Sequence, residues 1–328
     1  MDMTILKDTV TMDNIISRVK DIQSRCTDSY SDQLKMVQDG RVIWYRDENG
    51  CFRQNKMSEF SFSQLCNHMG VPTSYMNTCF DKGKEELVKK NLNTWLNENE
   101  KTFFLRRYQK DDEVVIRGML TSKYTKFDSP EMLDIVTDRL NVDDYDICGH
   151  FLNEERLHIR LKEKELLPIP GEDLFGGIMI DTSDVGRCGF RISYFVYKQI
   201  CTNGLCLSKG GGLLYNQKHI GIRPDEVAAE IERNLTLLPK FREEIIAQIK
   251  ASKNHEVSDL EIEKIMAKLK KQQGVGDKNL EKIISLMDTT YDRSRFGLIN
   301  GITEVAQEYS LEKRIELERF AGNLLLVA

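Results

Sequence analysis

Short strand-like runs separated by tight turn signals fill much of residues 41 to 198, and this spacing restricts the fold more than any other feature. Arg41–Arg46 reads as a strand, and Asp47–Gly50 follows it with an Asn-Gly pair that favours a hairpin turn. Similar runs occupy Thr102–Arg106, Glu113–Leu120, Tyr145–Leu152, Arg156–Leu161 and Asp173–Ile180. Because several neighbouring runs are joined by short turns, antiparallel pairing is expected. The sequence therefore predicts an α+β fold with a central, mostly antiparallel sheet and helices packed on it.

Helical patterns bracket this region and become continuous from about residue 224. Ile15 and Val19 belong to an apolar series at helical spacing near the start of the chain. Ser258 and Glu261 form a capping box that opens one of the later helices. Residues 194–202 fit either a strand or a short helix. We expect three parts, namely a helical lead-in over residues 1–40, an α+β core over residues 41–222 and a helical C-terminal region over residues 223–328.

Charge and cysteine content limit the possible partners and compartments. The formal net charge is -5, so any bound nucleic acid would need a local basic patch. The eight cysteines form no Cys-x-x-Cys pair, and the first residues show no signal-peptide pattern, which predicts free thiols in a reducing cytoplasm. No apolar stretch reaches the roughly 20 residues that span a bilayer, so no membrane association is expected.

Residues that could support an enzymatic reaction are scattered and form no complete motif. Asp146 with His150 or His158 could make a metal or general-base cluster, although structural histidines would give the same pattern. Cys201 has no histidine near it in the sequence to generate a thiolate. The glycine run in 209–213 lacks the ending of a Walker loop, and it fits a flexible loop or a weak phosphate cradle. We therefore predict no catalytic residue, no metal site and no cofactor.

Basic and aromatic residues are interleaved in three central segments. Single-stranded nucleic acid is held by bases stacked on aromatic rings and by phosphates that contact Lys or Arg. Tyrosine is also a good strand former, and basic residues at strand edges discourage aggregation, so an ordinary sheet would give the same pattern. The residues predicted to line a nucleic-acid groove are Arg106, Arg107, Lys123, Tyr124, Arg187, Arg191, Tyr197 and Lys198.

Several stretches, taken in order, are similar to one family of phage- and plasmid-borne proteins. They are Phe62–Pro72, Ile116–Asp128, Ser183–Arg191, Cys201–Leu205 and Arg295–Glu304. They resemble the proteins of domain-of-unknown-function family 932, with its Gly-Ile/Val-Pro helix end, Leu-Ser-x-x-Tyr-x-x-x-Asp, Ser-Glu-Val-Gly-Arg-Gly and Cys-Thr-Asn-Gly-Leu patterns. This chain has Asp184 and Cys188 where the family has Glu and Gly. The resemblance covers roughly residues 40 to 325 and implies a mobile-element origin without a settled activity.

Three functions of different classes follow as hypotheses. The first is single-stranded DNA binding or annealing in phage recombination or replication, by a homo-oligomer in the cytoplasm of a bacterial host. The second is a phage-encoded interaction protein that inhibits a host defence factor, because an acidic chain with a charged helical tail suits a protein partner. The third is a metal-dependent nuclease, although the sequence offers no Asp…Glu-x-Lys arrangement on a convincing strand pair.

Overall fold

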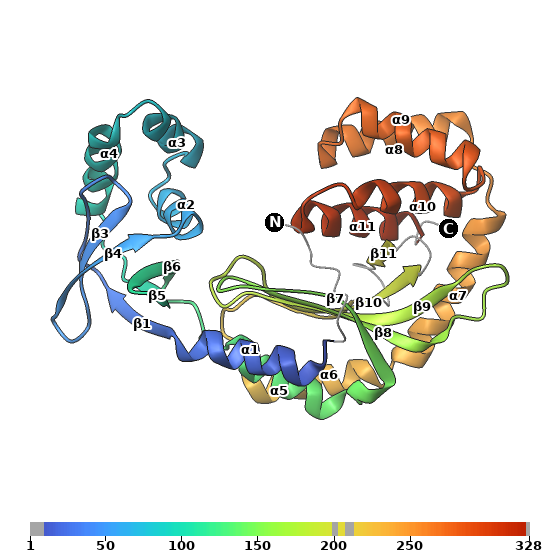
Figure 1. The fold of residues 1–328 in the computed structure, drawn as a ribbon, viewed down its shortest axis with the longest axis horizontal. Coiled ribbons are helices and arrows are strands. Elements are labelled where there is room, and N and C mark those ends of the chain that lie inside the picture. The colour runs from blue at the N-terminus through green and yellow to red at the C-terminus, as the bar shows by residue number, and fades with distance from the viewer. Residues whose placement is uncertain (1–9, 199–202, 207–212, 326–328) are drawn as a thin grey trace.

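The chain folds into two sheets with helices around each (Figure 1). The computed structural model describes residues 10–198, 203–206 and 213–325. It confirms the α+β class, the mostly antiparallel pairing and a helical region over residues 224–325. The strands are divided between two sheets, whereas the sequence predicted one central sheet. We call β1 to β6 with α2 to α4 the first lobe, and the remaining described elements the second lobe.

The first sheet has the strand order β1-β5-β6-β4-β3-β2. Its strands are β1 (Cys26–Ser31), β2 (Leu34–Val37), β3 (Val42–Arg46), β4 (Phe52–Met57), β5 (Phe103–Lys110) and β6 (Glu113–Thr121). The pairing is antiparallel except between β4 and β6, which run parallel where Lys56 lies opposite Val115. One face of this sheet packs on α2 (Glu59–His68), α3 (Thr73–Asp81) and α4 (Glu85–Asn97) around a common apolar core.

The expectation of a helical lead-in over residues 1–40 is wrong for part of that range. Helix α1 covers Met12–Ser24, but β1 and β2 follow it as strands of the first sheet. In β2, Leu34 and Met36 are buried while Lys35 is exposed, a period of two that belongs to a half-buried strand. The outer edge of β2 is closed by Asn93 of α4. The Asn93 amide accepts a hydrogen bond from the Met36 N–H at 2.7 Å and donates one to the Met36 carbonyl at 3.0 Å.

The second sheet has the order β11-β10-β9-β8-β7, with β12 also paired to β10. Its strands are β7 (Tyr145–Leu152), β8 (Leu157–Leu166), β9 (Leu174–Thr182), β10 (Phe190–Lys198), β11 (Asn203–Cys206) and β12 (Leu213–Gln217). Residues 194–198 are therefore strand, and 199–202 lie outside the described residues. Asn203 and Gly204 begin β11, opposite Lys198 and Tyr197.

Helices cover both faces of the second sheet. Strand β8 alternates, with Leu157, Ile159 and Leu161 in the core that includes α1, α5 (Ser129–Arg139) and α6 (Pro224–Leu235). On the other face, Arg160 reaches Glu318 of α11. The remaining helices are α7 (Leu238–Asn254), α8 (Asp259–Gln273), α9 (Asp277–Thr289), α10 (Arg295–Ala306) and α11 (Leu311–Leu325). They share one apolar core, and Figure 1 shows α7 passing one end of the sheet.

Candidate functional site

Arg106 lies at the junction of the two lobes and its guanidinium group is fully used there. The side chain is 0% exposed. It donates to Asp28 at 3.0 Å, to Asp128 at 2.6 Å and to the Asp184 carbonyl at 2.7 Å. Burial disfavours the charged form, but Asp128 and Asp28 outweigh this and hold the pKa of Arg106 above its usual value. Arg106 therefore has no surface to offer a nucleic acid in this arrangement.

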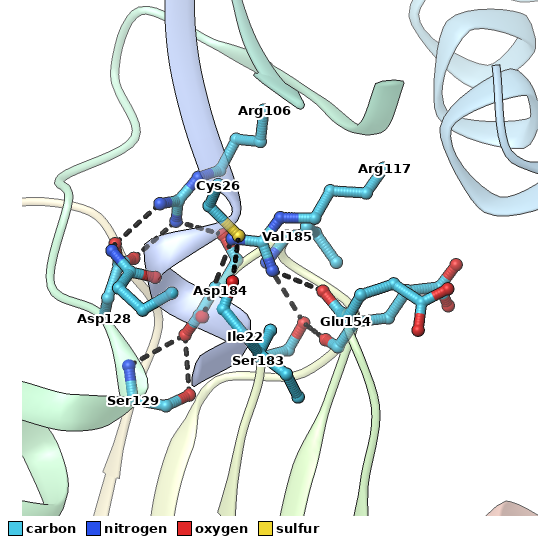
Figure 2. A network of polar contacts seen from close by, with 12 residues as sticks. Ile22, Cys26, Arg106, Arg117, Asp128, Ser129, Glu154, Ser183, Asp184 and Val185 are labelled. Atoms are coloured by element: carbon cyan, nitrogen blue, oxygen red, sulfur yellow. Dashed lines mark hydrogen bonds and ion pairs between the residues drawn. The ribbon is translucent and has the colours of Figure 1, made fainter. Parts of the chain in front are cut away.

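The carboxylates around Arg106 connect three segments that are distant in sequence (Figure 2). Asp184 accepts hydrogen bonds from the Ser129 N–H at 2.9 Å and from its hydroxyl at 2.7 Å, at the start of α5. Burial raises the pKa of Asp184, with the nearby Asp128 adding to the effect. Burial also acts on Asp128, but the hydrogen bonds from Arg106 prevail and lower the pKa of that carboxyl. The network thus joins β1, β5, α5 and the 183–185 turn by buried, charge-assisted contacts.

Arg117 of β6 adds a second buried guanidinium to this network (Figure 2). It donates to the Glu154 carbonyl and lies 3.7 Å from a carboxylate oxygen of Asp184. Its Nε and one terminal nitrogen have no hydrogen-bond partner among the described residues. Burial of a guanidinium with incomplete hydrogen bonding is costly, so this part of the junction depends on the carboxylate beside it.

Six of the other predicted residues are also engaged with protein groups. One is Tyr124, whose hydroxyl donates to the Asp184 carbonyl at 2.8 Å. Arg107 faces the first lobe and donates to the Tyr45 hydroxyl at 3.3 Å. Arg191 donates to the Asn216 side chain at 3.3 Å, and burial, together with Arg319, lowers the pKa of Arg191. Lys198 lies 3.0 Å from Glu172. Arg187 pairs with Glu155 and Glu312, and Tyr197 packs at the side of a small cluster of Met179 and Phe195.

The eight predicted residues do not form one groove. Arg106 and Arg107 follow each other on β5, whereas Arg191, Tyr197 and Lys198 belong to β10 of the other sheet. Tyr124 and Arg187 both line a pocket of about 460 Å³ between the lobes, which we call the junction pocket. Lys123 is exposed in the turn beside Tyr124.

The histidine and carboxylate pairs considered from the sequence are separated by the strand register. Asp146 lies opposite Lys162, while His158 lies opposite Phe151 and Asp181. His158 is fully buried, and burial lowers its pKa to about 4 despite the nearby Asp181. In the described ranges, no group of three His, Cys, Asp or Glu side chains is placed to hold a metal ion. Cys201 and residues 209–212 of the glycine-run segment lie outside the described residues.

The layer between the second sheet and α11 is charged as well as buried. Arg156 donates to both oxygens of Asp181, at 2.8 and 2.7 Å. Arg160 and Arg314 both reach Glu318, at 2.6 and 2.8 Å. Burial opposes ionisation of Glu318, but the two arginines lower its pKa below the usual value. The C-terminal helix is thus held on the sheet partly by buried ion pairs, in addition to its apolar contacts.

A different surface combines aromatic rings with unpaired cations, and the sequence interpretation missed it. We call it the open strand face, and it is formed by Lys35, Val37, Val42, Trp44, Arg46, Phe52, Gln54 and Lys56. These residues are cross-strand partners on β2, β3 and β4, so they share the face opposite α2 to α4. Trp44 and Phe52 stack with ring centroids 4.9 Å apart and an interplanar angle of 21°. The Phe52 side chain is 63% exposed, and the Arg46 guanidinium lies 5.8 Å from its ring.

All the charged residues of the open strand face are positive. Lys35, Arg46 and Lys56 are exposed, and none of them forms an ion pair with another described residue. None of the eight residues of this face is Asp or Glu. The signal was visible in the sequence, because Ile43 and Tyr45 alternate with Trp44 and Arg46. Alternation alone does not reveal which face a second lobe will cover.

No match was found among known protein-family models, curated proteins or solved structures, so the resemblance to domain-of-unknown-function family 932 stays an expectation. Over residues 10–198, 203–206 and 213–325, no helix is long and apolar enough to cross a membrane.

Proposed function

We propose that this protein binds single-stranded nucleic acid on the open strand face. The observation that carries the proposal is the Trp44–Phe52 stack, in which Phe52 is exposed and Trp44 is half-buried. Lys35, Arg46 and Lys56 flank it, and no carboxylate belongs to the same face. Bases stack on aromatic rings whatever their sequence, and Lys or Arg beside the rings contacts the phosphates.

The open strand face is large enough to bind a few nucleotides of a single-stranded nucleic acid. Adjacent strands of a sheet lie about 4.8 Å apart, so the three strands place their side chains within reach of a few successive nucleotides. Trp44 belongs to β3 and Phe52 to β4, and each ring can present a face or an edge to a base. Duplex DNA hides its base faces in the stack, so this arrangement favours a single strand over a duplex.

The proposal changes which residues are expected to contact the strand. Arg106 is excluded by its burial, and Arg191 and Lys198 lie on the second sheet. The function remains the one expected from the sequence, now assigned to other side chains. Annealing, recombination and a mobile-element setting are parts of the proposal that rest on the family resemblance.

Fluorescence anisotropy with a labelled oligonucleotide of about 15 residues tests the proposal, since this length is near the upper end of the about 4–16 nucleotides that one OB fold binds. We expect binding that weakens as salt rises from about 50 to 200 mM, since phosphate contacts release counterions. Phe52→Ala should weaken binding about tenfold, given a stacking contribution of about 1–3 kcal/mol per base. A Lys35→Gln/Arg46→Gln/Lys56→Gln variant should lower the slope of log K against log salt by about 2.

Matched control variants come from the opposite side of the same lobe. Trp95 is 47% exposed on α4, so Trp95→Ala removes an exposed ring away from the open strand face. Lys82→Gln/Lys84→Gln/Lys90→Gln removes three exposed charges of the same sign. Binding that is absent at low salt, or that falls equally in the control variants, would reject this face as the site.

A further inference from the structure

The junction pocket is built from four segments that meet between the lobes. Its walls come from α2 with Asn67 and His68, from the end of β6 and the turn at Tyr124, and from residues 186–189 and 218–220. Its volume of about 460 Å³ lies within the range of small-molecule sites, which is about 300–1,000 Å³. The pocket is separate from the open strand face, which shares no residue with it.

Among the described residues, the lining of the junction pocket contains no carboxylate. The other described pockets contain several each, such as Glu155 and Glu312 in one and Asp111 and Asp112 in another. A shortage of acidic residues does not explain this contrast between the pockets, because the chain has 52 Asp and Glu and only 47 Lys and Arg. Lys218 lines the pocket, is exposed and forms no ion pair within the described part of the chain. A ligand with a negative group would therefore meet attraction here without a competing acid.

One wall of the pocket is flat and aromatic. The rings of Tyr124 and His219 stack with centroids 5.1 Å apart and an interplanar angle of 5°. His219 is 3% exposed, and neither ring nitrogen has a hydrogen-bond partner among the described residues. Burial lowers the pKa of His219 to about 4, so the ring is neutral near pH 7. Leu120 and Ile220 extend this apolar lining, and Ile220 is 59% exposed.

A polar side chain of α2 can form hydrogen bonds with the edge of a planar ring. Asn67 is exposed on α2, and its amide offers both a donor and an acceptor. The Gln64 amide is occupied, because it donates to the Val185 carbonyl and accepts from the Met119 N–H, both at 2.8 Å. Asn67 is thus the amide of this wall that remains able to pair with a ligand.

We propose that the junction pocket binds a nucleoside monophosphate, with the base between the aromatic wall and Asn67 and the phosphate at Lys218. The same chemistry is present in a free nucleotide and in the terminal nucleotide of a strand. Residues of both lobes line the pocket, so its occupation would stabilise their present arrangement by mass action.

Isothermal titration calorimetry on the full chain with AMP, CMP, GMP and UMP tests the proposal. We expect at least one of them to bind with a Kd below about 1 mM, a weak but measurable affinity. Adenosine and inorganic phosphate, used as separate ligands, should each bind more weakly than AMP. A 5′-phosphorylated dinucleotide compared with AMP separates a strand end from a free nucleotide, and the tighter of the two identifies the source.

Two exposed positions supply variants that preserve the fold. Lys218→Gln should weaken nucleotide binding about tenfold and leave adenosine binding unchanged, because it removes one charge-assisted contact. Lys90→Gln, on α4 outside the pocket, is the matched control. Asn67→Ala should change the preference among the four bases.

The proposal is overturned if no nucleotide binds the folded protein, if phosphate alone binds as well as AMP, or if Lys218→Gln has no more effect than the control. Trp95→Ala, on α4 and outside both surfaces, should leave nucleotide binding unchanged. Oligonucleotide binding that fails while nucleotides still bind would reject the open strand face alone, and the reverse result would reject the pocket alone.

Discussion

Replacing Arg106 with Met removes the central cation of the lobe junction, and we expect a large loss of stability. The guanidinium is 0% exposed, and its partner Asp128 is 1% exposed. The carboxylate therefore cannot rotate toward solvent when the arginine is lost. Breaking a buried ion pair by removing one partner costs about 3–5 kcal/mol. We expect the free energy of unfolding to fall by about 4 kcal/mol near pH 7, a value at the middle of that range.

The loss of unfolding free energy caused by Arg106→Met should become smaller as the pH is lowered. In the native protein, Arg106 holds the pKa of Asp128 below its ordinary 3.8, so the ion pair stabilises the fold above that pH and its contribution is lost as the pH falls through the lowered pKa. In Arg106→Met, burial without the arginine raises the pKa of Asp128 above 3.8. Acidification then neutralises a buried, unpaired charge, and the variant gains stability relative to the native protein.

Urea unfolding measured by circular dichroism and by tryptophan fluorescence tests both parts. Both tryptophans, Trp44 and Trp95, belong to the first lobe, so the fluorescence follows that lobe while circular dichroism follows the whole chain. Coincident transitions are needed before a single free energy is assigned. Asp128→Asn and the double variant complete a cycle, in which the double variant should be less destabilised than the sum of the singles. A loss below about 1 kcal/mol, typical of an exposed pair, or a loss equal at about pH 7 and about pH 4, would refute the reasoning.

Three further substitutions have definite expected outcomes. Glu318→Gln leaves two buried arginines without their shared carboxylate, and it should lower the free energy of unfolding by about 3 kcal/mol in chemical denaturation; an unchanged midpoint would contradict this. Gly118→Ala places a methyl group 2.8 Å from Val185 across the lobe junction, and it should lower Tm by more than Gly276→Ala, where no described residue lies within 4 Å and only the N-cap of α9 is altered. Ser258→Ala removes the side-chain cap of α8 and should cost about 1 kcal/mol, so a cost near zero would show that the hydroxyl is not needed.

Local patterns were sufficient to predict the class of the fold and most of its strands. The run Arg41–Arg46 and the Asn-Gly turn after it appear as β3 and the β3–β4 hairpin, with Gly50 at a φ of +80°. The division into two sheets depends on long-range pairing, such as the parallel contact between Lys56 and Val115. Neither of these two segments carries a local sequence signal for that pairing. The pattern of strands in the sequence is therefore equally consistent with one sheet and with two.

The candidate sites were harder to predict because charge alone does not indicate exposure. Arg106 alternates with Leu105 along β5 and looks like an outward-facing residue, but its face of the strand meets the second lobe. Trp44 and Phe52 show the same kind of alternation, and their face remains open. The difference arises from the packing of the lobes, which places carboxylates beside one cation and leaves the others in solvent.

The Asn93 amide at the edge of β2 has a consequence for self-association. An exposed strand edge usually invites another chain to extend the sheet, since its N–H and carbonyl groups lack partners. Here the side chain of a helix supplies the donor and the acceptor that an incoming strand would offer, at the middle of a strand of only four residues. We therefore do not expect a homo-oligomer of this protein to form by strand addition at β2. Asn93→Ala would leave the Met36 N–H and carbonyl without these hydrogen bonds. We expect this variant to aggregate slowly while it keeps its secondary structure.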